Sequence, residues 1–147
     1  HLLLTLTDSD TAVWWQAPDS AAPHWLHFHT GAAQAEQPHE ASFAVLAQAA
    51  APPPLTQFAQ GTADAPEFST TLLLPVPSLT SGPALHWRGP GIAGEAVVRI
   101  DGLPADFVAR WQANHATFPQ GVDIIFCCGD AALGLPRSTQ IHRSQEA

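Results

Sequence analysis

Short apolar runs, separated by polar stretches that contain Gly and Pro, alternate along most of the chain. Runs of this kind, rich in β-branched residues and bounded by turn residues, are typical of strands. A Gly at the first central position of the turn Gly129-Asp130 favours a type II′ hairpin there. The pattern predicts strands over residues 11–15, 42–46, 70–79, 84–88, 96–100, 122–128 and 132–135.

Apolar residues at the spacing of a helix occur in fewer segments than the strand pattern does. Phe107, Val108 and Trp111 share one face of a helix and Pro104 suits its first turn, so a helix is predicted over residues 104–114. A short helix is expected over residues 19–28 and a helical turn over residues 55–60, while residues 2–6 suit the end of a helix or a strand, with the helix favoured. We therefore expect an α/β fold in a single domain over residues 1–147, with a mixed β-sheet flanked by a few helices.

The charge of the chain narrows the choice of partners. The sequence has no Lys, and its 5 Arg stand against 13 Asp and Glu residues, giving a formal net charge of -8 at pH 7. Nucleic acids and anionic membranes require a basic surface, so neither is expected as a partner. Without Lys, no Schiff base or phosphate-loop lysine is possible. Two adjacent cysteines do not form a secreted disulfide framework, so we expect a cytoplasmic protein.

The segment from Gly89 to Gly94 has the glycine spacing of a dinucleotide-binding fingerprint. That fingerprint binds pyrophosphate where a strand ends and a helix begins. Here a strand is predicted on both sides of the segment, and no acidic residue follows about twenty positions later. A glycine-rich hairpin loop is therefore the favoured interpretation.

Two clusters suggest metal or thiol chemistry, and neither has the required pattern. His24, His27 and His29 cannot share one face of a helix or of a strand, so we expect partly exposed histidines and no metal site. Cys127 and Cys128 lie in a predicted strand, where alternation sends their side chains to opposite faces. A packing role is expected for both thiols, because apolar surroundings lower thiol reactivity.

Asp123 interrupts an apolar strand and requires a partner. A hairpin that turns at Gly129-Asp130 would bring residue 123 level with about residue 136, next to Arg137. The favoured interpretation is a structural ion pair between Asp123 and Arg137 that fixes the register of the hairpin.

The alternative is an anion site. In that interpretation Arg137 and the hydroxyl groups of Ser138 and Thr139, with Arg88 as a further candidate, hold a phosphoryl or phosphonate group. The sequence shows no converging acid, base or nucleophile, so no catalytic residue is expected.

Several segments in order resemble one family along nearly the whole chain, from Leu2 to Ile141. They are "LLLTLTDSDTAVWW", "HFHTGA", "LTQFAQGTADAPEFSTTLLLPVPSLTSG", "LHWRGPGIAG" and "FPQGVDIIFCCGDAALGLPRST". The most specific part is FP-x-G-x-D followed by LPR-S-T, and the chain is identified by it as a member of the PhnH family. The family-like positions in that part are Gly121, Asp123, Pro136, Arg137 and Thr139, and Ser138 stands where a second Thr is expected.

The resemblance implies a subunit of the bacterial carbon–phosphorus lyase system, which acts in phosphonate use under phosphate starvation. That system makes α-D-ribose 1-methylphosphonate 5-triphosphate from ATP and methylphosphonate. The resemblance further implies a core assembly with PhnG-, PhnI- and PhnJ-like subunits, and a homodimer when the protein is isolated. It also implies an N-terminal segment beyond the sequence given.

The fold implied is similar to that of pyridoxal-phosphate-dependent transferases, without that cofactor or any other. The family pattern assigns no catalytic residue. The expected role is therefore structural, in assembly, and the alternative is a ligand-binding subunit that uses the segment Arg137-Ser138-Thr139.

Overall fold

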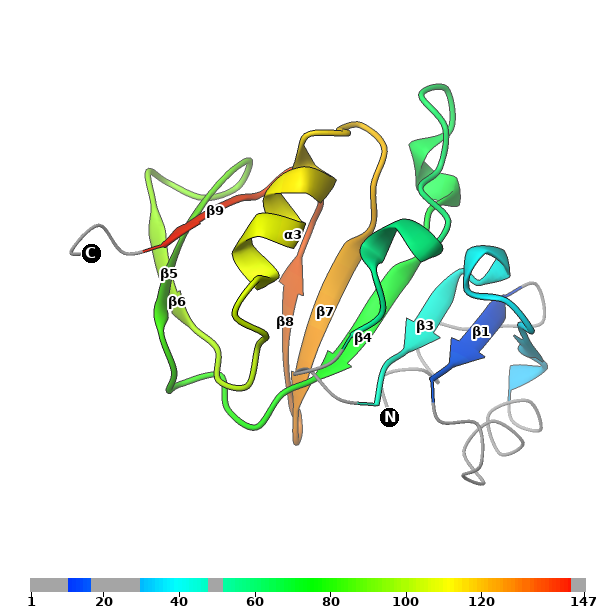
Figure 1. Cartoon of the computed structure of the whole chain (residues 1–147), viewed down its shortest axis with the longest axis horizontal. Coiled ribbons are helices and arrows are strands. Elements are labelled where there is room, and N and C mark those ends of the chain that lie inside the picture. Colours follow the sequence, from blue (N-terminus) through cyan, green and yellow to red (C-terminus); the bar gives the residue numbers. More distant parts are fainter. Residues whose placement is uncertain (1–10, 17–29, 48–51, 144–147) are drawn as a thin grey trace.

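The strands in the described part of the chain form two β-sheets (Figure 1). A computed structural model of the chain describes residues 11–16, 30–47 and 52–143. Its larger sheet has the strand order β2-β1-β3-β4-β7-β8 and its smaller sheet the order β6-β5-β9. The expected α/β fold with a mixed sheet is confirmed. The strands form two separate sheets, however, where a single sheet was expected.

The larger sheet is parallel except for its last strand. Its strands are β1 (Ala12–Trp15), β2 (Ala33–Gln34), β3 (Phe43–Val45), β4 (Thr71–Pro75), β7 (Asp123–Cys128) and β8 (Ala131–Leu135). Only β8 runs antiparallel, paired with β7 through the predicted hairpin. Strands buried on both faces are apolar without alternation, and β4 shows this pattern with Leu72, Leu73 and Leu74 all buried.

The smaller sheet is antiparallel throughout and consists of β5 (Ala84–Arg88), β6 (Ala96–Arg99) and β9 (Gln140–Arg143). The glycine-rich segment connects β5 to β6, so the predicted hairpin loop is confirmed and no helix follows it. The pattern did not predict β9, because Ile141 is its one apolar residue and lies among polar residues. It also did not predict β2, which has only two residues. The strand predicted over residues 70–79 is shorter in the structure, where β4 ends at Pro75 and the chain leaves the larger sheet.

The predicted helix near residue 104 is confirmed as α3 (Phe107–His115). It begins after Pro104, whose carbonyl accepts the first bond from the Phe107 N–H. The predicted helical turn after residue 55 is the short 3-10 helix η2 (Leu55–Gln57), and two further 3-10 helices are η1 (Pro38–Glu40) and η3 (Pro66–Phe68). The helices expected over residues 2–6 and 19–28 lie outside the described residues. No helix within the described ranges is long and apolar enough to cross a membrane.

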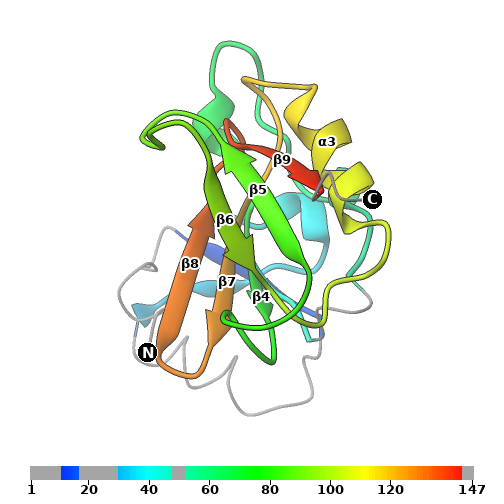
Figure 2. The same ribbon diagram turned by 90° about the vertical axis from the view of Figure 1, so that its left-hand side faces the viewer.

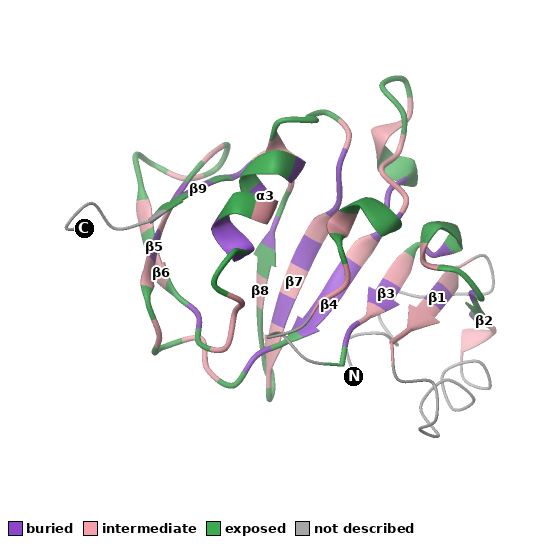
Figure 3. Cartoon of the chain, viewed as in Figure 1, coloured by how far each residue is buried: buried purple, intermediate pink, exposed green. Residues whose placement is uncertain are grey.

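The main core lies where α3 and the smaller sheet meet the β4–β7–β8 end of the larger sheet (Figures 2 and 3). Trp111 of α3 is fully buried in it and donates from Nε1 to the Thr139 carbonyl at 2.8 Å. Phe126 of β7 packs edge-on against Phe107, with ring centroids 5.9 Å apart. α3 therefore connects the two sheets and fixes the chain just before β9.

Replacing Trp111 with Phe should weaken this connection. The Thr139 carbonyl would lose its donor and the core would lose volume, so we expect the free energy of unfolding in urea to fall by about 1–3 kcal/mol. Gln112→Ala is the matched control, because Gln112 also donates to β9, at Ile141 O, from an exposed position. A loss for Trp111→Phe no larger than that of the control would contradict the role given to α3.

Candidate functional site

The β7–β8 hairpin brings Asp123 and Arg137 together. Cys128 pairs with Ala131 across a two-residue turn, in which Gly129 has φ +58° and Asp130 has no positive φ. This is the pattern of a type II′ turn, as predicted. Ile124 pairs with Leu135, so the next positions, Asp123 and Pro136, lie level. Arg137 therefore leaves β8 beside the carboxylate at the start of β7.

The Asp123 carboxylate is bound on both oxygens by Arg137. Arg137 Nη2 lies 2.7 Å from Oδ2, and Nε donates to Oδ1 at 3.1 Å. The Arg137 backbone N–H also donates to Oδ1, at 2.7 Å. Exposed fractions of 13% for the Arg137 side chain and 29% for Asp123 leave this bidentate pair partly shielded from water.

The remaining N–H groups of the guanidinium bind two other loops. Nη1 donates to the carbonyl of Pro66 at 2.7 Å and to that of Pro119 at 3.4 Å, and Nη2 donates to Ser69 Oγ. A guanidinium has five N–H donors, and all five of Arg137 are directed at protein acceptors. We call Arg137 with these four partners the Arg137 clamp. A phosphoryl group could bind this guanidinium only by displacing one of those acceptors.

The loop before β7 is held by Asn114 at the end of α3. The buried Asn114 side chain donates to Val122 O at 3.0 Å and accepts from Val122 N–H at 2.9 Å. Gly121 has φ +123°, and a Cβ atom there would lie 2.9 Å from Asn114 Oδ1. A side chain at position 121 would therefore collide with the amide that orients the loop. This explains why the FP-x-G-x-D segment has Gly at that position.

The other candidate ligand residues are placed differently. Thr139 is 1% exposed, and a Cβ atom added at Gly89 would lie 3.1 Å from its Cα, so the glycine-rich loop abuts the segment Ser138–Thr139. Arg88 has a side chain 62% exposed and donates from Nε to Glu95 Oε2 at 3.0 Å. The structure thus brings Ser138 and Thr139 to the glycine-rich loop, while Arg137 is directed at Asp123.

Glu95 on that loop is held by two side chains. His86 Nδ1 lies 2.8 Å from Glu95 Oε1, and Arg88 binds the other oxygen. The hydrogen bond with His86 and then that with Arg88 hold the pKa of Glu95 below its ordinary value. The carboxylate therefore stays charged, and it already accepts one of the hydrogen bonds that Arg88 can donate.

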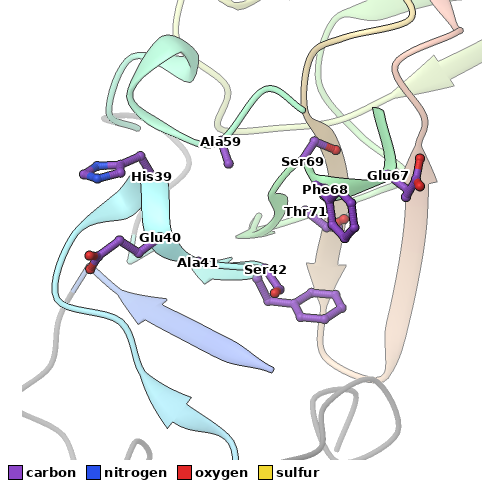
Figure 4. Close-up of a pocket in the computed structure, with 10 residues that line it drawn as sticks. His39, Glu40, Ala41, Ser42, Ala59, Glu67, Phe68, Ser69 and Thr71 are labelled. Atoms are coloured by element: carbon purple, nitrogen blue, oxygen red, sulfur yellow. The ribbon is translucent and has the colours of Figure 1, made fainter. Parts of the chain in front are cut away.

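A cavity of about 300 Å³ lies beside the Arg137 clamp, between η1 and η3 (Figure 4). It is lined by His39, Glu40, Ala41, Ser42, Phe43, Ala59, Glu67, Phe68, Ser69 and Thr71. Ser69 belongs to both the cavity and the clamp. Sequence reasoning missed this cavity, because its walls come from three segments that no local pattern relates. Of the described residues that line it, Glu40 and Glu67 are acidic and none is Lys or Arg, so we call it an acidic cavity.

The described ranges contain neither a candidate metal site nor an activated thiol. No group of three or more His, Cys, Asp or Glu there could hold a metal ion, and His24, His27 and His29 lie outside those ranges. Cys127 packs against the smaller core cluster and Cys128 against the main one, so the predicted opposite orientations are confirmed. Burial raises the pKa of the Cys127 thiol, which lowers its reactivity.

The fold and the clamp define an α/β protein whose motif arginine is bound within its own chain. The chain belongs to the PhnH family: the model of that family, described as bacterial phosphonate metabolism protein (PhnH), matches residues 1–142.

Two named relatives share this similarity. One is the alpha-D-ribose 1-methylphosphonate 5-triphosphate synthase subunit PhnH of Rhizobium meliloti (strain 1021), 44% identical over 142 residues that cover 95% of this chain and 71% of the relative. The other is the putative C-P lyase subunit protein HtxG of Stutzerimonas stutzeri, 34% identical over 82 residues that cover 56% of this chain and 42% of the relative.

Arg137→Lys tests whether the clamp depends on guanidinium geometry. A lysine keeps the charge but has three donors on one nitrogen, so it cannot reach all the acceptors of Arg137. We expect the free energy of unfolding to fall by about 1–3 kcal/mol. Arg88→Lys is the matched control and should change it by less than about 0.5 kcal/mol, because that pair is exposed. Equal effects of the two substitutions would rule out the clamp.

The raised pKa of Cys127 predicts slow alkylation. The thiolate reacts, so the midpoint of Cys127 alkylation against pH, mapped by mass spectrometry, should lie above that of the same thiol in the urea-unfolded chain. A midpoint at or below the unfolded value would show that the thiol is not shielded.

Proposed function

We propose that this chain is an assembly subunit of a carbon–phosphorus lyase system and is not catalytic by itself. In this role it supports synthesis of α-D-ribose 1-methylphosphonate 5-triphosphate from ATP and methylphosphonate during phosphonate catabolism. Family membership and the names of the two relatives support the system to which it belongs. The observation that carries the assembly role is the Arg137 clamp, because its guanidinium is fully used within the chain.

Charge supports the same role. Within the described residues, Arg88 and Arg110 are paired with carboxylates, as is Arg137, and Arg99 donates to the Gly82 carbonyl. A subunit that bound a triphosphate alone would need a cleft of positive potential. A chain with net charge -8 and paired arginines is better suited to contacts with other proteins.

The partners proposed are PhnG-, PhnI- and PhnJ-like subunits, with a homodimer for the isolated chain and a cytoplasmic location for the assembly. We further propose that residues 1–147 form a single domain. A relationship of the fold to pyridoxal-phosphate-dependent transferases stays a prediction from the family resemblance.

The second candidate is a ligand-binding subunit. It is favoured by the contact between Gly89 and Thr139, which joins the loop of Arg88 to the hydroxyl-bearing segment Ser138–Thr139. The exposed guanidinium of Arg88 is the group on this segment that could reach a phosphoryl or phosphonate group contributed with a partner chain.

Co-purification distinguishes these two functions. The full-length chain, tagged and expressed with the other phosphonate subunits, should recover a stoichiometric complex whose synthase activity requires this chain. Recovery of the tagged chain alone would contradict the assembly role.

Arg88→Ala then tests the second candidate in the same complex. Because Arg88 is exposed, the variant should fold and assemble, and the assembly role predicts unchanged activity. Loss of at least about tenfold in activity with the complex intact would favour ligand binding. Arg99→Ala, a second exposed arginine of the smaller sheet, is the control.

A further inference from the structure

Two of the most exposed large apolar side chains lie on the loops that the Arg137 clamp joins. Phe68 is 75% exposed and Phe118 is 55% exposed. Phe68 follows Pro66 by two residues and Phe118 precedes Pro119, and the carbonyls of both prolines accept from Arg137 Nη1. A direct link between the loops supports this placement, since Gln120 donates to Gly61 O at 3.1 Å. The clamp therefore holds two exposed aromatic rings in one region of the surface.

The loop that carries Phe68 is fixed along its length. Gln60 and Ser69 form a bridge at its base, and Thr62 Oγ1 accepts from Ala65 N–H at 2.9 Å inside it. It includes η3 and projects from the body of the protein (Figure 1). A surface that is already ordered loses little conformational entropy when a partner binds. Exposed aromatic rings on rigid supports are typical of the energetically important residues of interfaces.

The surroundings of Phe68 are acidic. Phe68, Glu67 and Glu40 line the same cavity, and none of the described lining residues is Lys or Arg (Figure 4). Asp64 lies on the same projecting loop and is exposed. The Arg137 guanidinium, which binds the cavity residue Ser69, is neutralised by Asp123. We call Phe68, Phe118, Glu40 and Glu67 the acidic aromatic face.

We propose that the acidic aromatic face docks a basic surface of a partner subunit, with an Arg or Lys of that partner in the cavity whose lining includes Glu40, Glu67 and Phe68. Charge complementarity favours this occupant, since the cavity lining carries two acidic residues beside the aromatic Phe68. A second copy of this chain is disfavoured, because two surfaces of net negative charge would repel each other. This inference rests on the proposed assembly function and identifies the surface that performs it.

The aromatic part is tested by Phe68→Ala combined with Phe118→Ala in the full-length tagged chain, expressed with the other phosphonate subunits. Both side chains are exposed, so folding should not change, and thermal unfolding of the variant checks this. We expect recovery of partner subunits per tagged chain to fall about tenfold or more. Val97→Ala, at an exposed apolar residue of β6 that is 61% exposed, is the control and should retain the complex.

The charge part is tested by Glu67→Lys in the same experiment. We expect a similar loss of partner subunits, together with weaker binding of the wild type as NaCl is raised. Asp130→Lys reverses an exposed carboxylate on the hairpin turn and should have no such effect.

The outcomes separate this inference from the proposed function. Failure of the wild-type chain to recover partners would remove both. A wild-type complex that survives the Phe68/Phe118 and Glu67 variants would overturn the acidic aromatic face alone. Loss of a homodimer with retention of the other subunits would also overturn it, because a second copy would then be the occupant.

Discussion

The bidentate ion pair between Arg137 and Asp123 is the contact on which the arrangement of this end of the molecule depends. Asp123 begins β7 and Arg137 follows β8, so the pair closes the open end of the hairpin. The same guanidinium reaches the carbonyls of Pro66 and Pro119 and the hydroxyl of Ser69. One side chain thus joins three segments that are distant in sequence. Removing it would leave a partly shielded carboxylate and several acceptors without partners, which is why such pairs are costly to break.

The clamp also explains what the residues of the family motif do physically. In FP-x-G-x-D, Pro119 supplies a carbonyl, Gly121 allows the approach of Asn114, and Asp123 supplies the carboxylate. In LPR-S-T, Arg137 supplies the guanidinium and Thr139 supplies the carbonyl that Trp111 binds. These residue types serve to hold loops in place. The Arg and Thr of this motif therefore make contacts within the chain itself.

Local patterns predicted β5 to the residue, the helix α3, and the hairpin register that pairs Asp123 with Arg137. They did not predict the other acceptors of the clamp, because every residue has a backbone carbonyl and only the tertiary fold selects Pro66 and Pro119. The cavity was missed for a similar reason. The division into two sheets depends on the strand β9, whose four residues bury one apolar side chain and carry no clear alternation.

The most direct test of the clamp is heteronuclear NMR of the arginine Nε–H groups of the full-length chain during titration with methylphosphonate. An internal clamp predicts that the Arg137 Nε–H exchanges slowly with water and that its chemical shift does not change during the titration. A saturable shift of the Arg137 signal, or rapid exchange in the free protein, would show that the guanidinium is available to ligand and would contradict the account.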